Sequence, residues 1–146
     1  LKIADGLAAR IDTDPRAYAG LVRAEVHLAQ NQARLALDAL RDAQSLADTW
    51  LSHVLMARTY LALDQFTEAT SEIDVAIKRR GEATALGLDD WPTYRYFPPV
   101  LYFQGLAQEG LKSPAAKGTF AAFLAIKKDG DETGGLVALV RRRVAP

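Results

Sequence analysis

Apolar residues recur along this chain at helical spacing, and short polar breaks divide them into consecutive segments. Near the start, Ile3, Leu7 and Ile11 stand four residues apart, which places them on one face of a short helix. Asp14 and Pro15 interrupt this spacing, and an acidic residue followed by proline is typical of a helix start. The pattern therefore predicts one short helix and then a new helix with Asp14 as its N-cap.

The next segments are separated by short polar turns at residues 31–32 and 64–65. On both sides of each turn the apolar positions have helical spacing, as in Leu21, Ala24 and Leu28 before the first turn. Two amphipathic helices joined by such a turn form a helix hairpin, in which each helix covers the apolar stripe of the other. The sequence therefore predicts two consecutive helix hairpins.

Small and large residues repeat between these two hairpins at an offset of 33 positions. A fixed period in this range is typical of a helical array, in which each unit buries its apolar face by stacking on the next. Alanine at the repeated positions lets two helices approach to ~8–10 Å, while a larger residue on the facing turn fills the space. The first set is Ala24, His27, Ala36, Leu40 and Ala43, and the second is Ala57, Tyr60, Ala69, Ile73 and Ala76.

A third, less regular copy follows, with Gly105 standing 48 residues after Ala57 and with Ala116 and Phe120 on its second helix. The last apolar stretch ends in three arginines, and cations at a helix C-terminus complement the helix dipole. We therefore predict a single all-α domain. Its parts are a partial repeat (1–15), three repeats (16–48, 49–80 and 98–128), an insertion (81–97) and a C-terminal capping helix (131–146).

This pattern resembles the tetratricopeptide repeat (TPR) family. Ala57 and Tyr60 match the small and aromatic positions of its first helix, Ala69 and Ile73 match its second helix, and His27 takes the aromatic place in the first copy. The resemblance implies a right-handed α-α superhelix of about three hairpins, whose first helices line a concave groove. The end of the chain also resembles the C-terminal ends of bacterial multidomain TPR proteins, some of which carry a Ser/Thr kinase domain.

Composition narrows the classes of function. Lys+Arg and Asp+Glu both number 18, so the chain lacks the basic excess that nucleic-acid binding usually needs. There is no cysteine, which excludes disulfides and thiolate sites, and no apolar run reaches the ~18–20 residues that span a bilayer. We expect a cytoplasmic protein. Because Leu1 stands in place of an initiator methionine, we expect a piece of a longer or processed polypeptide.

Candidate catalytic or metal-binding residues are few. The chain has two histidines, His27 and His53, and neither has a nucleophile or carboxylate at a spacing that suggests a catalytic dyad. The pair Asp89-Asp90 has no third or fourth oxygen ligand nearby, so a helix end and a solvated turn explain it better than a cation site. We therefore predict no enzyme activity, no cofactor and no bound metal.

The TPR resemblance implies a protein or peptide partner in the groove, and the mainly apolar residues there suit an apolar peptide or helix. The alternative is that this surface packs on an adjacent domain or on the insertion, making the chain a structural or dimerisation module that positions a catalytic domain, such as a kinase, absent from it. The insertion is a second candidate surface, because aromatic residues are enriched at interface hot spots. The groove residues are Tyr18, Leu21, Glu25, Val54, Arg58, Leu61, Tyr102 and Leu106, and those of the insertion are Trp91, Tyr94 and Tyr96.

Overall fold

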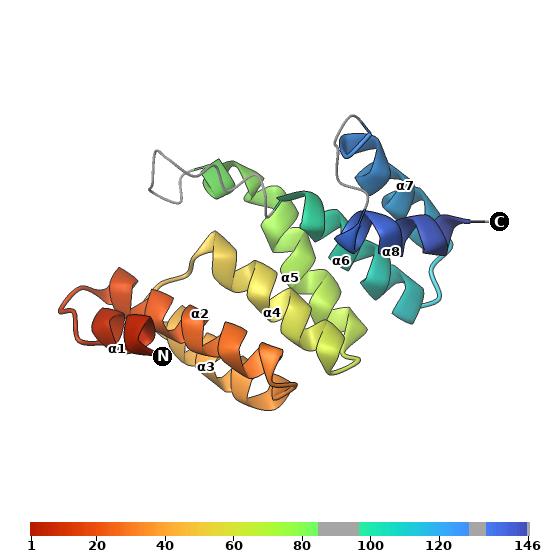
Figure 1. Ribbon diagram of the computed structural model, residues 1–146. Coiled ribbons are helices and arrows are strands. Elements are labelled where there is room, and N and C mark those ends of the chain that lie inside the picture. The colour runs from red at the N-terminus through yellow and green to blue at the C-terminus, as the bar shows by residue number, and fades with distance from the viewer. Residues whose placement is uncertain (85–96, 129–133, 146) are drawn as a thin grey trace.

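The computed structural model describes residues 1–84, 97–128 and 134–145. Within these ranges all regular secondary structure is helical, which confirms the predicted all-α class. The helices succeed one another across the molecule in chain order, and the two termini lie at opposite ends (Figure 1). The elements are α1 (Lys2–Ala8), α2 (Thr13–Ala29), α3 (Ala33–Leu46), α4 (Trp50–Ala62), α5 (Phe66–Lys78), the 3-10 helix η1 (Arg80–Thr84), α6 (Phe97–Gly110), α7 (Ala116–Ile126) and α8 (Gly135–Val144).

Each helix packs most extensively on its neighbours in the chain. The closest pairs are α2 with α3, α4 with α5, and α6 with α7, and each pair is joined by a short turn. Successive pairs are connected through contacts between α3 and α4 and between α5 and α6. In addition, α2 contacts α4 and α4 contacts α6, so the first helices of the three hairpins touch in sequence.

The three hairpin turns have the same backbone geometry. Asn31, Asp64 and Lys112 each have a φ near 57°, in the left-handed region (58°, 56° and 56°). In each turn the backbone N–H of the next residue donates a hydrogen bond to a carbonyl oxygen of the preceding helix. The three N···O distances are 2.8 Å, 2.9 Å and 2.8 Å. This is the Schellman arrangement, which satisfies carbonyls that the end of a helix leaves free. The turns stand at the offsets of 33 and then 48 that the sequence predicts.

Among the residues that the structure describes, the core consists of two adjoining clusters. The larger extends from α2 to α6 and includes the fully buried Trp50, Leu40 and Ile73. The smaller joins α6, α7 and α8 around Phe120 and Val140. At ~25 cal/mol per Å² of apolar surface, burial of each of these large side chains contributes about 1.5–3 kcal/mol.

The second cluster depends on a close approach between α6 and α7 at Gly105. A Cβ atom added there would lie 2.3 Å from a ring carbon of Phe120. No real side chain tolerates that distance, so the small residue at this repeat position makes room for the aromatic ring of the facing helix.

The start of α2 differs from the prediction. The helix begins at Thr13 with Asp12 as its N-cap, so Asp14 and Pro15 lie inside its first turn. Proline is compatible with the first turn because its fixed φ suits a helix and the N–H groups there have no partner within the helix. Residues 13–15 therefore belong to α2.

Candidate functional site

The first-helix face is the surface formed by the exposed side chains of α2, α4 and α6. Of the residues predicted to bind a partner, five contribute accessible surface there. Each is half-buried. They are Tyr18 and Glu25 of α2, Arg58 and Leu61 of α4, and Leu106 of α6.

Three other predicted residues belong to the interior. Leu21 and Val54 are buried in the larger core cluster, and Tyr102 packs with Phe120 and Phe123 in the smaller one. The expectation that these side chains point outward is therefore corrected. Leu21 and Val54 lie in the cluster that spans α2 to α6, where α4 packs on both α2 and α6, whereas α7 and α8 contribute the residues packed around Tyr102. The remaining predicted residues, Trp91, Tyr94 and Tyr96, lie outside the residues that the structure describes.

Arg58 connects all three first helices. Its Nη1 lies 2.5 Å from Oε1 of Glu25 on α2, and its guanidinium carbon lies 6.0 Å from the ring centre of Phe103 on α6. Guanidinium groups favour the faces of aromatic rings at this distance. Glu25 and Arg58, which the sequence analysis named among the groove residues, are thus partners of one another.

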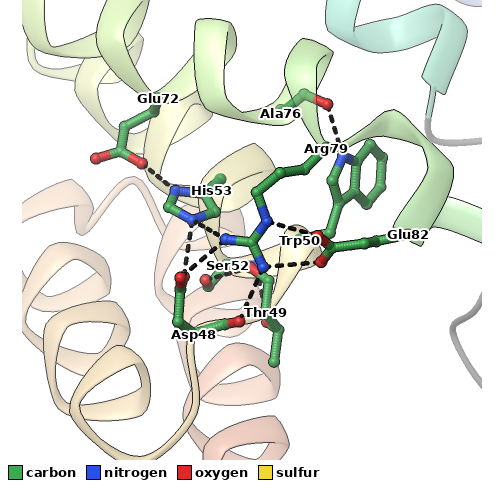
Figure 2. A network of polar contacts seen from close by, with 9 residues as sticks. All are labelled: Asp48, Thr49, Trp50, Ser52, His53, Glu72, Ala76, Arg79 and Glu82. Atoms are coloured by element: carbon green, nitrogen blue, oxygen red, sulfur yellow. Dashed lines mark hydrogen bonds and ion pairs between the residues drawn. The ribbon is translucent and has the colours of Figure 1, made fainter.

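A second group of polar residues surrounds His53, and we call Asp48, His53, Glu72, Arg79 and Glu82 the His53 cluster (Figure 2). The His53 side chain is buried, with 7% of its surface exposed. Its Nδ1 lies 2.6 Å from Oε2 of Glu72, and its Nε2 lies 2.8 Å from Oδ1 of Asp48. The ring therefore spans the space between the α3–α4 connection and α5.

Arg79, which follows α5, completes the cluster. Its guanidinium donates to Oδ2 of Asp48 and to both carboxylate oxygens of Glu82, each at 2.8 Å. Its Nη1 also lies 3.0 Å from Nε2 of His53. The guanidinium occupies the space between the two carboxylates in Figure 2, so it ties η1 to the α3–α4 connection.

The electrostatics of the cluster follow from these contacts. Burial alone would lower the pKa of His53, but the hydrogen bond and charge of Glu72, aided by Asp48, raise it above its ordinary value. Burial would raise the pKa of Asp48, but the positive charges of His53 and Arg79 lower it. The hydrogen bonds from Arg79 also lower the pKa of Glu82. The charged form of each group therefore stabilises the charged forms of its partners.

Trp50 stabilises the same region as the cluster. Its indole N–H donates to the carbonyl oxygen of Ala76, 2.8 Å away, in the last turn of α5. Carbonyls in the last turn of a helix lack a donor within that helix, so the indole satisfies a buried acceptor. Together with the His53 cluster, this bond fixes the start of α4 against the end of α5.

A cleft of about 260 Å³ opens beside the His53 cluster. Burial raises the pKa of Tyr18, one of its lining residues, and the charge of Asp14 raises it further. The carboxylates of Asp14 on α2, Asp48 in the α3–α4 connection and Glu82 on η1 all line this cleft. The lining residues are Asp14, Tyr18, Ala47, Asp48, Thr49, Trp50 and Glu82.

Two further hollows, of about 380 and 420 Å³, adjoin the turn of the second hairpin and share Arg34 and Leu63. They lie between the start of α3 and the end of α4, and the exposed Leu35 contributes to the larger one. The sequence did not indicate this surface, because its residues belong to the polar side of α3 and to a turn.

In the part of the chain that the structure describes, no three His, Asp or Glu side chains are arranged to hold a metal ion. Although Asp48 and Glu72 both approach His53, they contact opposite ring nitrogens and therefore lie on opposite sides of the imidazole. The neighbouring hydroxyl of Ser52 donates to the Thr49 carbonyl over 2.6 Å. The cluster is thus a set of ion pairs around one group, the His53 imidazole, that can gain or lose a proton.

No protein-family model, curated protein or solved structure matches this chain. Among the described helices, none is both long enough and apolar enough to cross a bilayer. The contacts and charges above are therefore the basis for the functional proposals that follow.

The sequence analysis missed the His53 cluster. Glu72 lies 19 positions and Arg79 lies 26 positions from His53, so only the packing of α5 on α4 brings them together. One local signal was present, because Asp48 stands five residues before His53, just ahead of the N-cap Thr49. Because α4 begins between Asp48 and His53, the sequence spacing alone did not indicate that the two side chains are in contact.

Proposed function

We propose that this chain is a non-catalytic interaction scaffold with a TPR-like arrangement, and that its first-helix face binds an apolar peptide or helix of a partner protein. The arrangement is supported by three hairpins whose Schellman turns recur at the repeat offsets and whose first helices touch in order. A stack of this kind presents equivalent residues at regular intervals, which suits the recognition of an extended segment.

The observation that carries the binding proposal is the composition of the accessible first-helix face. Tyr18, Leu61 and Leu106 offer apolar surface, and the Glu25–Arg58 pair supplies a fixed pair of opposite charges beside it. Amphipathic helices are recognised through apolar anchors at helical spacing, with charges at the rim that select orientation.

An exchange of charges tests this proposal. The double variant Glu25→Arg, Arg58→Glu retains an ion pair between α2 and α4 but reverses the charges that a partner would meet. The matched control exchanges two exposed charges on a second helix, Asp38→Arg with Arg41→Glu on α3. We expect affinity capture to lose a partner with the first variant and to retain it with the control. Equal capture by both folded variants would contradict binding at this face.

A second function is favoured by the apolar surface at the N-terminal end of the array. Ile3 of α1 is 74% exposed, and Ile11, in the connection between α1 and α2, is 95% exposed. Large apolar groups gathered at one end favour a packing role against another domain or a second copy of the chain. Light scattering over a range of concentrations tests the second-copy form of this role, because a mass that stays monomeric would contradict self-association.

A further inference from the structure

We propose that the His53 cluster is a proton-operated latch, in which protonated His53 clamps the α3–α4 connection onto α5 and loss of the proton releases Asp48 from the ring. This inference is independent of the proposed binding function. It rests on a buried imidazole that contacts two carboxylates from different segments, 2.6 Å and 2.8 Å away. Because the connection joins the first hairpin to the second, the latch acts on the junction between them.

The groups that face His53 come from every segment packed around it. Asp48 belongs to the α3–α4 connection and Glu72 to α5, while Arg79 follows α5. Glu82 of η1 acts through Arg79, to which it is bound. With the imidazole protonated these five groups carry a net charge of −1, since three are carboxylates and one is a guanidinium, and proton loss makes the charge −2.

In the protonated state both ring nitrogens carry a hydrogen. Nδ1–H donates to Glu72 and Nε2–H donates to Asp48, which fits both observed distances, while Nη1 of Arg79, 3.0 Å from Nε2, donates to Oδ2 of Asp48 and not to the ring. Hydrogen bonds between ionised groups are roughly twice as strong as neutral ones, so this state ties the connection firmly to α5. Arg79 then donates hydrogen bonds to the other carboxylate oxygen of Asp48 and to both carboxylate oxygens of Glu82.

In the neutral state one ring nitrogen must accept instead of donate. If Nδ1–H keeps its bond to Glu72, the lone pair of Nε2 repels the Asp48 oxygen that it contacted. Nη1 of Arg79 is already 3.0 Å from Nε2 and can donate to it. The neutral ring therefore remains satisfied, while Asp48 loses its hydrogen bond to His53 and the attraction of the imidazolium charge and keeps only its contacts with Arg79.

The direction of the pH effect follows from this exchange of partners. The pKa of His53 is raised in the folded chain, from an ordinary value of 6.5. The stabilisation is then fully present below the unfolded pKa and is lost as the pH rises through the folded pKa. The latch is closed in mildly acidic solution and opens on the alkaline side of 6.5.

Three measurements on the intact chain test the latch. The first is an NMR titration of the wild-type imidazole nitrogens, and we expect His53 to titrate above 6.5 with both nitrogens protonated in the acidic form. The second compares denaturation midpoints at about pH 6 and about pH 8.5 in wild type, His53→Gln and His27→Gln. His27→Gln is the matched control because it removes the only other histidine.

We expect the wild-type and His27→Gln midpoints to fall between the two pH values and the His53→Gln midpoint to change much less. Amide exchange at Ser52, corrected for its intrinsic pH dependence, should quicken in the wild type as the latch opens, since this N–H bonds within the connection. Titration of His53 at or below 6.5 in the folded chain would overturn the proposal, whether or not His53→Gln folds. An equal pH dependence in His53→Gln and wild type would also overturn it.

Discussion

Glu25 and Arg58 occupy the same position in successive hairpins, 33 residues apart, and their side chains form an ion pair between α2 and α4. Arg58 also lies over the ring of Phe103 on α6. A register position that in an isolated hairpin would face solvent is thus used to connect neighbouring units. Residues at the first-helix face therefore act in the stacking of the array as well as forming its surface.

This pair should show measurable coupling. We predict that a double-mutant cycle with Glu25→Gln and Arg58→Gln gives a coupling free energy of about 0.2–1 kcal/mol, because both side chains are partly exposed. Urea denaturation of the four proteins in low salt measures it. The coupling should shrink in about 1 M salt, where charges are strongly screened. A coupling that is unchanged by salt would mean that packing, and not charge, links the two residues.

The close approach at Gly105 gives a prediction with a matched control. Gly105→Ala places a methyl group against the buried ring of Phe120, and we expect a loss of roughly 1–3 kcal/mol in the free energy of unfolding. Gly118→Ala adds the same atom on α7, where nothing lies within 4 Å, and should stabilise the chain by up to about 1 kcal/mol because alanine favours helix. If chemical denaturation shows equal effects for the two variants, α6 and α7 do not cross at Gly105.

The bond between Trp50 and Ala76 predicts a large effect from a small change. Trp50→Phe keeps an aromatic ring but removes the donor, leaving the Ala76 carbonyl buried without it. We expect a loss of about 1–3 kcal/mol for the unsatisfied group, with an added cost for the smaller ring. Thermal denaturation followed by circular dichroism measures this loss, and a melting temperature equal to that of wild type would contradict the role of the indole N–H.

The decrease in the free energy of unfolding as the pH falls should depend on Arg79. The pKa values of Asp48 and Glu82 are lowered in the folded chain, so their stabilising effect is present above their unfolded values and is lost as the pH falls through the folded ones. Arg79→Gln should therefore flatten the loss of stability between about pH 5 and about pH 2.5. Arg41→Gln, on the exposed side of α3, is the control that should leave the slope unchanged. Equal slopes in both variants would contradict the role of Arg79.

Much of the fold could be predicted because the signals are local or periodic. The polar turns, the small residues and the helical stripes each lie within one hairpin, and the offset of 33 relates two hairpins without any need for long-range information. The small residue at Gly105 was recognised for the same reason. The predicted N-cap of α2 was wrong by two residues, Asp14 in place of Asp12, because proline suits either a break or the first turn of a helix.

The candidate site was harder to predict because exposure depends on packing between units. Leu21 and Val54 are buried in the core cluster that extends over successive hairpins, where α4 packs on both α2 and α6. No periodicity within a hairpin reveals this burial. The His53 cluster likewise joins residues that only the stacking of α5 on α4 brings together, so a single sequence offers little sign of it.

The most direct test of the proposed interaction surface is site-specific photo-crosslinking. A photoreactive amino acid replaces Leu61 on the first-helix face in one protein and the exposed Asp74 of α5, a second helix, in another. Both are mixed with lysate and irradiated, and the products are identified by mass spectrometry. Our account predicts one discrete partner crosslinked from position 61 and none from position 74. Crosslinks to the same partner from position 74 alone would contradict it.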